Sequence, residues 1–147
     1  MVYKRKAHVL FVGNGDPSRA LIAAAFANVL GLHFMRARAV ELQRMPCLPQ
    51  LSSIMHEVGL DVSNPRLYLL YRDNIAWADL VVALDVAAAA ACPVLPTWVQ
   101  KRCYPFAPPE DIESLRRVRD AIQQRVAGMV GGMAFMAAFD ERNICVR

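Results

Sequence analysis

The distribution of apolar and polar positions predicts strands that are buried on both faces. His8 to Val12 is an apolar run that stops at Gly13, and Leu80 to Leu84 is a second run that stops at Asp85. His33 to Val40 is a third candidate strand. Apolar runs without polar alternation are typical of parallel sheets, because helices cover both faces of such sheets.

The segment after the first strand carries the signals of a buried helix. Asp16 suits an N-cap, and Pro17 suits the first helical position, where the missing N–H removes no hydrogen bond. Ala20 to Leu30 is apolar nearly all round, and Gly31 predicts the end of the helix.

Three further helices are predicted. One opens at Pro49 and stops at Gly59, and a short one contains the alanine run Ala87 to Ala91. The last begins near Pro108 to Asp111 and has an arginine-rich face that we interpret as solvated surface. Its apolar stripe consists of Ile112, Leu115, Val118, Ile122 and Val126.

Strands that alternate with helices favour an α/β fold, with a parallel sheet between two helical layers. Ligands of such folds sit at the carboxyl ends of the strands. In this chain those ends are Gly13 to Ser18, Asp85, and the loop around Phe106 to Pro109.

The loop from Gly13 to Arg19 has the character of an anion site. A glycine-rich turn that opens a helix presents backbone N–H groups and the positive end of the helix dipole. No Gly-Lys-Ser/Thr follows, so the phosphate loop of nucleotide hydrolases is absent.

A dinucleotide-binding turn is an alternative interpretation of the same loop. Gly13 and Gly15 supply two of the three expected glycines, while Ser18 stands at the third position and Pro17 removes one N–H. Glu41 lies at a plausible distance along the chain for a ribose contact.

Composition narrows the class of protein. The 147 residues are 56% hydrophobic and 20% charged, which fits one folded domain with a sizeable core. A net charge of +4 and a pI near 9.1, without a basic tail, predict no nucleic-acid partner.

The longest apolar stretch, about Ala20 to Leu32, is too short to span a bilayer, and no signal peptide is evident. We therefore expect a cytoplasmic protein that does not bind membranes.

The cysteines do not predict a metal site or a disulfide framework. Cys47, Cys92, Cys103 and Cys145 form no CxxC pair, and no histidine stands at metal-ligand spacing. We expect reduced thiols, no metal and no cofactor.

The segment Val9 to Ala20 resembles the signature of low-molecular-weight protein tyrosine phosphatases, in which a strand runs into Cys-x5-Arg-Ser. Arg19 matches the arginine. The resemblance extends to about Arg125, and several segments are similar to the thioredoxin-coupled arsenate reductase branch. The segments similar to that branch are Ala78 to Leu84, Cys92-Pro93, Val99 to Lys101, Phe106 and Leu115 to Asp120. Met55 to Ser63 resembles the segment after the family's second helix. The implied fold is a three-layer α/β domain with a four-stranded parallel sheet.

The sequence departs from the family at the positions of the family's catalytic residues. Gly13 stands where the resemblance places the nucleophilic cysteine, and Ala20 replaces the hydroxyl that supports it. Pro108 stands where the general acid is expected, and Asp85 where the first relay cysteine is expected. Cys92 matches the second relay cysteine.

We therefore assign no catalytic residue: Gly13, Asp85 and Pro108 are degenerate positions, and Asp16 and Asp111 are the candidate substitutes. Asp16 replaces the loop asparagine and places a carboxylate where it repels an oxyanion. The predicted anion-binding residues are Asn14, Gly15, Asp16, Ser18 and Arg19.

We expect residues 1–128 to form the phosphatase-like domain and residues 129–147 to form an apolar extension. The extension would turn at Gly131-Gly132 and pack on the domain or form a homodimer interface.

The leading hypothesis is a catalytically inactive binding or regulatory module, a pseudoenzyme with a residual loop for a small oxyanion or a phosphorylated ligand. The alternatives are a phosphatase or arsenate reductase that acts through Asp16, Asp85 or Asp111, and a nucleotide-binding module.

Overall fold

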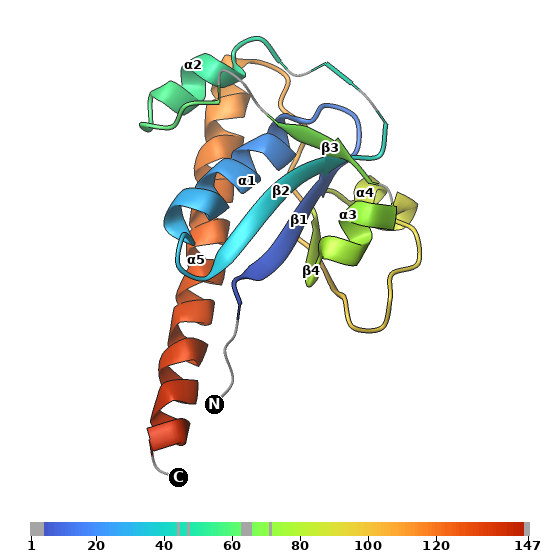
Figure 1. Cartoon of the computed structure of the whole chain (residues 1–147). Helices are drawn as coiled ribbons and strands as arrows, with labels where there is room; N and C mark the ends of the chain where they lie inside the picture. The colour runs from blue at the N-terminus through green and yellow to red at the C-terminus, as the bar shows by residue number, and fades with distance from the viewer. Residues whose placement is uncertain (1–4, 44, 47, 63–65, 71, 146–147) are drawn as a thin grey trace.

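The computed structural model describes residues 5–43, 45–46, 48–62, 66–70 and 72–145, with side chains to residue 136 apart from that of Arg72. Strands and helices alternate along the whole chain (Figure 1). In chain order they are β1 (Ala7–Gly13), α1 (Ser18–Leu30), β2 (Met35–Glu41), α2 (Leu51–His56), β3 (Leu67–Leu69), α3 (Arg72–Trp77), β4 (Leu80–Ala83), α4 (Val86–Ala91), β5 (Gln100–Cys103) and α5 (Ile112–Cys145).

The sheet is parallel and has the strand order β3-β2-β1-β4-β5, which confirms the α/β class. The expected number of four strands is wrong, because five are present. β3 has only three residues, all half-buried, and β5 is a fully exposed Gln-Lys-Arg-Cys segment. Neither segment has the apolar run by which the central strands are recognised.

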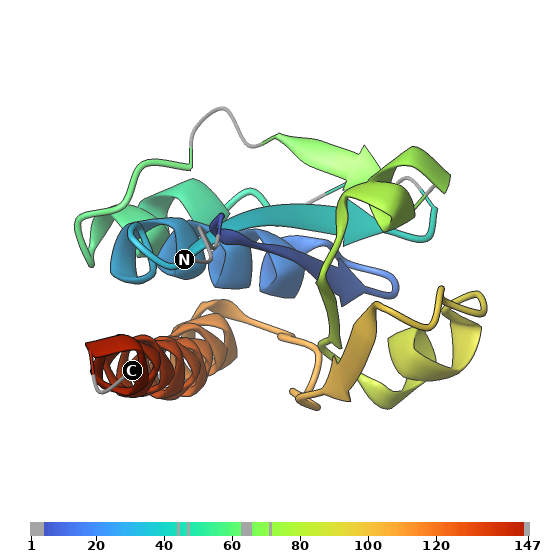
Figure 2. The same cartoon turned by 60° about the horizontal axis from the view of Figure 1, so that its bottom comes forward.

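Helices cover both faces of the sheet, so the predicted three layers are confirmed. Figure 2 shows α1 and α5 side by side on one face, with α3 and α4 on the other side. Successive residues of β1 contribute to different cores: Phe11 packs into the α1–α5 cluster, and Leu10 and Val12 into the α3–α4 cluster. This division follows from the two-residue period of a strand.

The predicted ends of α1 are close to the observed ones. The helix begins at Ser18 with Pro17 in the N-cap position, one residue later than expected. Gly31 ends the helix, as predicted. A Cβ on Gly31 would lie 2.7 Å from both the Ala27 carbonyl oxygen and Met35 Cγ, so this position requires glycine.

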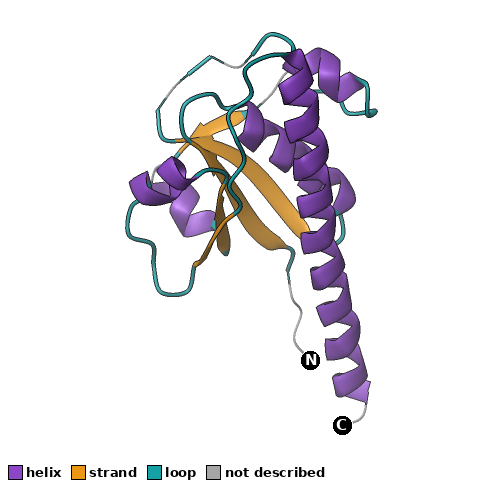
Figure 3. Ribbon diagram, turned by 180° about the vertical axis from the view of Figure 1, so that it is seen from behind, coloured by secondary structure: helices purple, strands orange, loops and turns teal. Residues whose placement is uncertain are grey.

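The expected turn at Gly131-Gly132 is wrong. α5 continues through both glycines as one helix of 34 residues, and its C-terminal part projects beyond the sheet (Figure 3). A glycine in a helix interior costs only about 1 kcal/mol relative to alanine, so this pair does not end the helix. In the described part of the chain, no helix combines the length and the apolar character that crossing a membrane requires.

The first half of β2 has a strand on one side only. β3 pairs with β2 at Ala39 to Glu41, and no described strand lies beside the preceding residues. Asn28 of α1 takes that place at Ala37: its Nδ2 donates to the Ala37 carbonyl (3.0 Å), and its Oδ1 accepts from the Ala37 N–H (2.8 Å).

An ion network joins α2 to α5. Arg119 is buried, and its Nη1 donates to the Ile54 carbonyl (2.8 Å) and to Glu57 (2.6 Å). Arg116 also binds Glu57 (2.8 Å). Part of the arginine face of α5 is therefore a helix contact rather than the solvated surface expected. Hydrogen bonds from Arg116, and then from Arg119, lower the pKa of Glu57 to about 2.

The network predicts a defined acid sensitivity. The pKa of Glu57 is about 2 in the fold and 4.5 in its ordinary range. The contribution of the Glu57 carboxylate to the free energy of unfolding is therefore complete above pH 4.5 and is lost as the pH falls toward 2. We expect Glu57→Gln to lower the melting temperature at pH 7, and this deficit to shrink at pH 3. Glu110→Gln is the control, since Glu110 is exposed and makes no ion pair within the described residues. A deficit that is the same at both pH values would contradict the assignment.

Candidate functional site

The structure brings together the three loops that the sequence indicated. β1 ends at Gly13 and α1 begins at Ser18, and the turn between them contains Gly15 at φ +85°. This left-handed conformation favours glycine. Asp85 directly precedes α4, and Phe106 follows β5.

Arg19 connects these loops. Its side chain is 4% exposed. The Nη1 atom donates to the Phe106 carbonyl at 2.7 Å, and Nη2 donates to the Asn14 carbonyl at 3.3 Å. The same Nη2 lies 3.0 Å from the carboxylate of Asp85. The guanidinium is thus buried and neutralised within the chain.

Asp85 has three roles in this arrangement. Its Oδ2 forms the ion pair with Arg19 and accepts from the Asn14 N–H at 3.3 Å. Its Oδ1 accepts from the Ala88 N–H and caps α4. A carboxylate at a helix N-terminus is stabilised by the exposed N–H groups and the helix dipole. The Asp85 side chain is 16% exposed, so the ion pair is mostly removed from water.

Asp16 occupies donors at the start of α1. Its Oδ1 accepts from the Ser18 N–H at 3.0 Å and from the Ser18 hydroxyl at 2.7 Å. Two of the predicted anion-binding residues therefore bind each other. A hydroxyl and an N–H that an oxyanion would use are engaged by a carboxylate of the chain itself.

Two atoms of the loop are buried without a hydrogen-bond partner among the described residues: Asp16 Oδ2, an acceptor, and Arg19 Nε, a donor. Buried polar atoms are nearly always paired, so such a combination calls for a physical explanation. Both atoms are covered by protein, so a ligand would reach them only if the loop opened.

Gly13 lies at the carboxyl end of β1, opposite Glu41 of β2. A Cβ placed on Gly13 would lie 3.7 Å from the Asp16 carbonyl oxygen and 3.8 Å from Ala20 Cβ, which are ordinary contacts. The backbone therefore accommodates a side chain at this position. The glycine reflects neither crowding nor a strained backbone.

The remaining candidate residues lie outside this contact set. Asp111 is exposed, and its Oδ1 accepts from the Ser114 N–H at 2.7 Å. The hydrogen bonds of Ser114 lower the pKa of Asp111, which disfavours the protonated form that a general acid needs. Pro108 is exposed.

The described thiols do not contact Arg19. Cys103 is exposed, and its Sγ donates to the backbone carbonyl of Asp85 at 3.8 Å. Cys92 is half-buried beside the α3–α4 core, and burial raises the pKa of its thiol. Cys47 and the Cys145 side chain lie outside the described residues.

Sequence reasoning missed the partners of Arg19. Asp85 was identified as a strand end, a degenerate position and a candidate catalytic carboxylate, but not as the ion-pair partner of Arg19. Phe106 contributes a backbone carbonyl, which no residue type reveals. The available signal was topological: β1 and β4 are adjacent parallel strands, so residues directly after them meet at one sheet edge.

The chain is similar in sequence and fold to known arsenate reductases, and in fold to a phosphatase. No family model matches the chain. Arsenate reductase 1 of Staphylococcus epidermidis is 29% identical over 124 residues, which cover 83% of this chain and 94% of the reductase. The fold is that of the arsenate reductases.

Two solved structures carry this conclusion about the fold. An arsenate reductase in the phosphate binding state superposes with a TM-score of 0.73 at 24% identity, covering 86% of this chain and 98% of that chain. The YwlE arginine phosphatase from Geobacillus stearothermophilus gives a TM-score of 0.68 at 17% identity, covering 88% and 94%. Both likenesses show that the fold is shared.

The burial of the Arg19–Asp85 pair predicts a large effect on stability. Asp85→Ala leaves a desolvated guanidinium without its counter-charge, so we expect the unfolding free energy to fall by about 3–5 kcal/mol. Urea unfolding measures this loss. Asp111→Ala also removes a carboxylate that caps a helix, but from an exposed site, and should cost much less. Equal losses in the two variants would show that capping alone accounts for the effect.

Proposed function

We propose that this protein is a non-catalytic binding or regulatory module of the phosphatase and arsenate-reductase superfamily. The observation that carries the proposal is the buried Arg19–Asp85 ion pair at 3.0 Å. In a site that turns over an oxyanion, the arginine must be available to the substrate. Here Asp85 holds the charge that the substrate would bring.

The absence of a nucleophile at residue 13 supports the same proposal. Glycine has no side chain that could attack phosphorus or arsenic, although the backbone there would accept one. Loss of a nucleophile typically lowers kcat by about 10⁶.

Relocated chemistry is the competing function, and in this family it would be arsenate reduction or phosphoester hydrolysis. Its candidate carboxylates already have structural roles: Asp16 binds Ser18, Asp85 binds Arg19, and Asp111 caps α5. Each would have to leave its partners to act on a substrate.

The nucleotide-binding alternative is not favoured by Glu41. Glu41 is only 4% exposed, and its Oε2 accepts a hydrogen bond from the Met45 N–H at 3.1 Å. The carboxylate is thus not presented to a ribose. Titration with NADPH, followed by intrinsic fluorescence, tests this alternative directly.

The residual oxyanion loop is expected to prefer an anion that carries a proton. Asp16 Oδ2 needs a donor, and Arg19 Nε needs an acceptor. Hydrogenphosphate and hydrogenarsenate offer both a hydroxyl and anionic oxygens, whereas sulfate at neutral pH only accepts. The Asp85 carboxylate opposes either anion, so affinity in the native protein should be weak.

Anion titration tests this loop. We expect Asp85→Asn, which retains a capping oxygen and removes the negative charge, to bind phosphate at least about tenfold more tightly than the native protein. Phosphate and arsenate should raise the melting temperature more than sulfate. Asp111→Asn is the matched control and should behave like the native protein. If Asp85→Asn gives no response to any anion at tens of millimolar, the loop is not an oxyanion site.

Activity assays test the non-catalytic assignment separately. We expect no turnover of para-nitrophenyl phosphate and no thioredoxin-coupled arsenate reduction above the buffer background, because no side chain at residue 13 can attack. Gly13→Cys should fold normally. Activity of the native protein that Arg19→Ala abolishes would overturn the proposal, and its loss in Cys103→Ser would assign it to the exposed thiol.

A further inference from the structure

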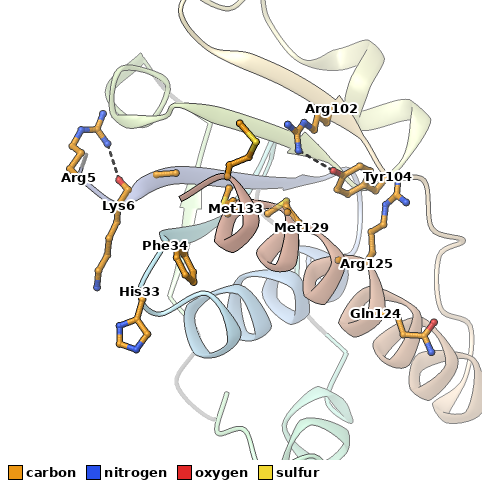
Figure 4. A pocket seen from close by; sticks show the side chains of 14 residues that line it. Arg5, Lys6, His33, Phe34, Arg102, Tyr104, Gln124, Arg125, Met129 and Met133 are labelled. Atoms are coloured by element: carbon orange, nitrogen blue, oxygen red, sulfur yellow. Dashed lines mark hydrogen bonds between the residues drawn. The ribbon is translucent and has the colours of Figure 1, made fainter. Parts of the chain in front are cut away.

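A cavity of about 930 Å³ lies away from the Arg19 loop, between α5, the start of β1, the turn after α1 and the end of β5 (Figure 4). Ala7 lines the cavity, whereas Gly13 lies at the other end of the same strand. No residue of the loop from Gly13 to Arg19 is part of its wall. The volume falls in the range of small-molecule sites.

One wall of the cavity is apolar, and α5 forms the part of it that faces the strands. Phe34, Met129 and Met133 line it, and Figure 4 shows the two methionines on the helix beside Phe34. Methionine is flexible and polarisable, so such a wall adapts to a chain-like apolar ligand.

Glycines open this wall. Gly128 and Gly132 both line the cavity, and they stand one helical turn apart on α5. A Cβ added at either position would meet no atom within 4 Å. The missing side chains therefore leave open space beside this wall of the cavity.

The rim of the cavity is cationic. Lys6, Arg102 and Arg125 line it, and no aspartate or glutamate does among the side chains that the structure describes. The Arg125 guanidinium lies 4.1 Å from the centre of the Tyr104 ring, and Arg102 Nη1 donates to the Tyr104 hydroxyl at 3.4 Å. These contacts orient both arginines without neutralising them.

Arg5 also reaches the cavity, but its charge is offset elsewhere. Its guanidinium forms a two-point ion pair with Asp79, at 2.7 and 2.8 Å. The anion-attracting groups of the described wall are therefore the two arginines beside Tyr104 and the neighbouring Lys6.

We propose that this cavity binds a free, single-chain carboxylate of the fatty-acid class. The chain would lie along the methionines and the two glycine positions, where apolar surface is removed from water. The carboxylate would pair with Arg102 and Arg125, which are suited to carboxylate binding. A cationic amphiphile would meet like charge at the rim.

Calorimetric titration with monomeric decanoate tests the proposal on the full chain. We expect saturable binding below about 1 mM and at least about tenfold weaker binding by Gly132→Leu, which fills the cavity. Gly131→Leu is the matched control, because Gly131 lies next in the same helix, has open space around it and does not line the cavity. Both variants replace a helix glycine by a good helix former, so both should fold.

A second pair of variants tests the charge. The double variant Arg102→Gln and Arg125→Gln should weaken decanoate binding at least about tenfold, whereas Arg117→Gln, on an exposed position outside the cavity, should not. Decyltrimethylammonium, with the same chain length and the opposite charge, should not bind.

Four results would overturn the proposal. They are no saturable decanoate binding at about 1 mM, undiminished binding by Gly132→Leu, equal affinity for decyltrimethylammonium, or binding only to vesicles that contain phosphatidylglycerol. The last result would assign the cationic rim to a membrane surface instead.

Discussion

The candidate site depends on the desolvation of one guanidinium. Arg19 is almost entirely buried, and a buried charge is tolerated only when it is paired and hydrogen-bonded. The chain supplies Asp85 together with two backbone carbonyls, those of Asn14 and Phe106. These partners belong to the loops after β1, β4 and β5, so a single side chain fixes the carboxyl ends of three strands relative to one another.

The pairing of Arg19 with Asp85 also affects how the loop can bind an anion. A buried arginine attracts any anion that reaches it, and the first anion in place is the carboxylate that also begins α4. An incoming oxyanion competes with a partner that is covalently part of the protein and that loses little freedom on pairing. The charge of Arg19 therefore serves to hold the loops of the fold together.

Much of this architecture could be predicted from the sequence. β1, β4 and α1 are recognised because they are largely buried, so their sequences are almost continuously apolar. β3 and β5 were not predicted, because β3 is too short to show a pattern and β5 is a polar strand at a sheet edge. The loop residues were identified individually, but the pairing of Arg19 with Asp85 follows from the order of the strands. The glycines of α5 were misinterpreted, because glycine marks a turn only where packing does not hold the helix.

Asn28 has a consequence for how this molecule can associate. An open strand edge is a template for β-augmentation by a peptide or a second sheet, and such edges are a common route to aggregation. The Asn28 amide occupies the outward N–H and C=O of Ala37 in the exposed half of β2. A strand added there would first have to displace a donor and an acceptor that are already in register. At this stretch of β2, the helix α1 therefore protects the strand edge from a further strand.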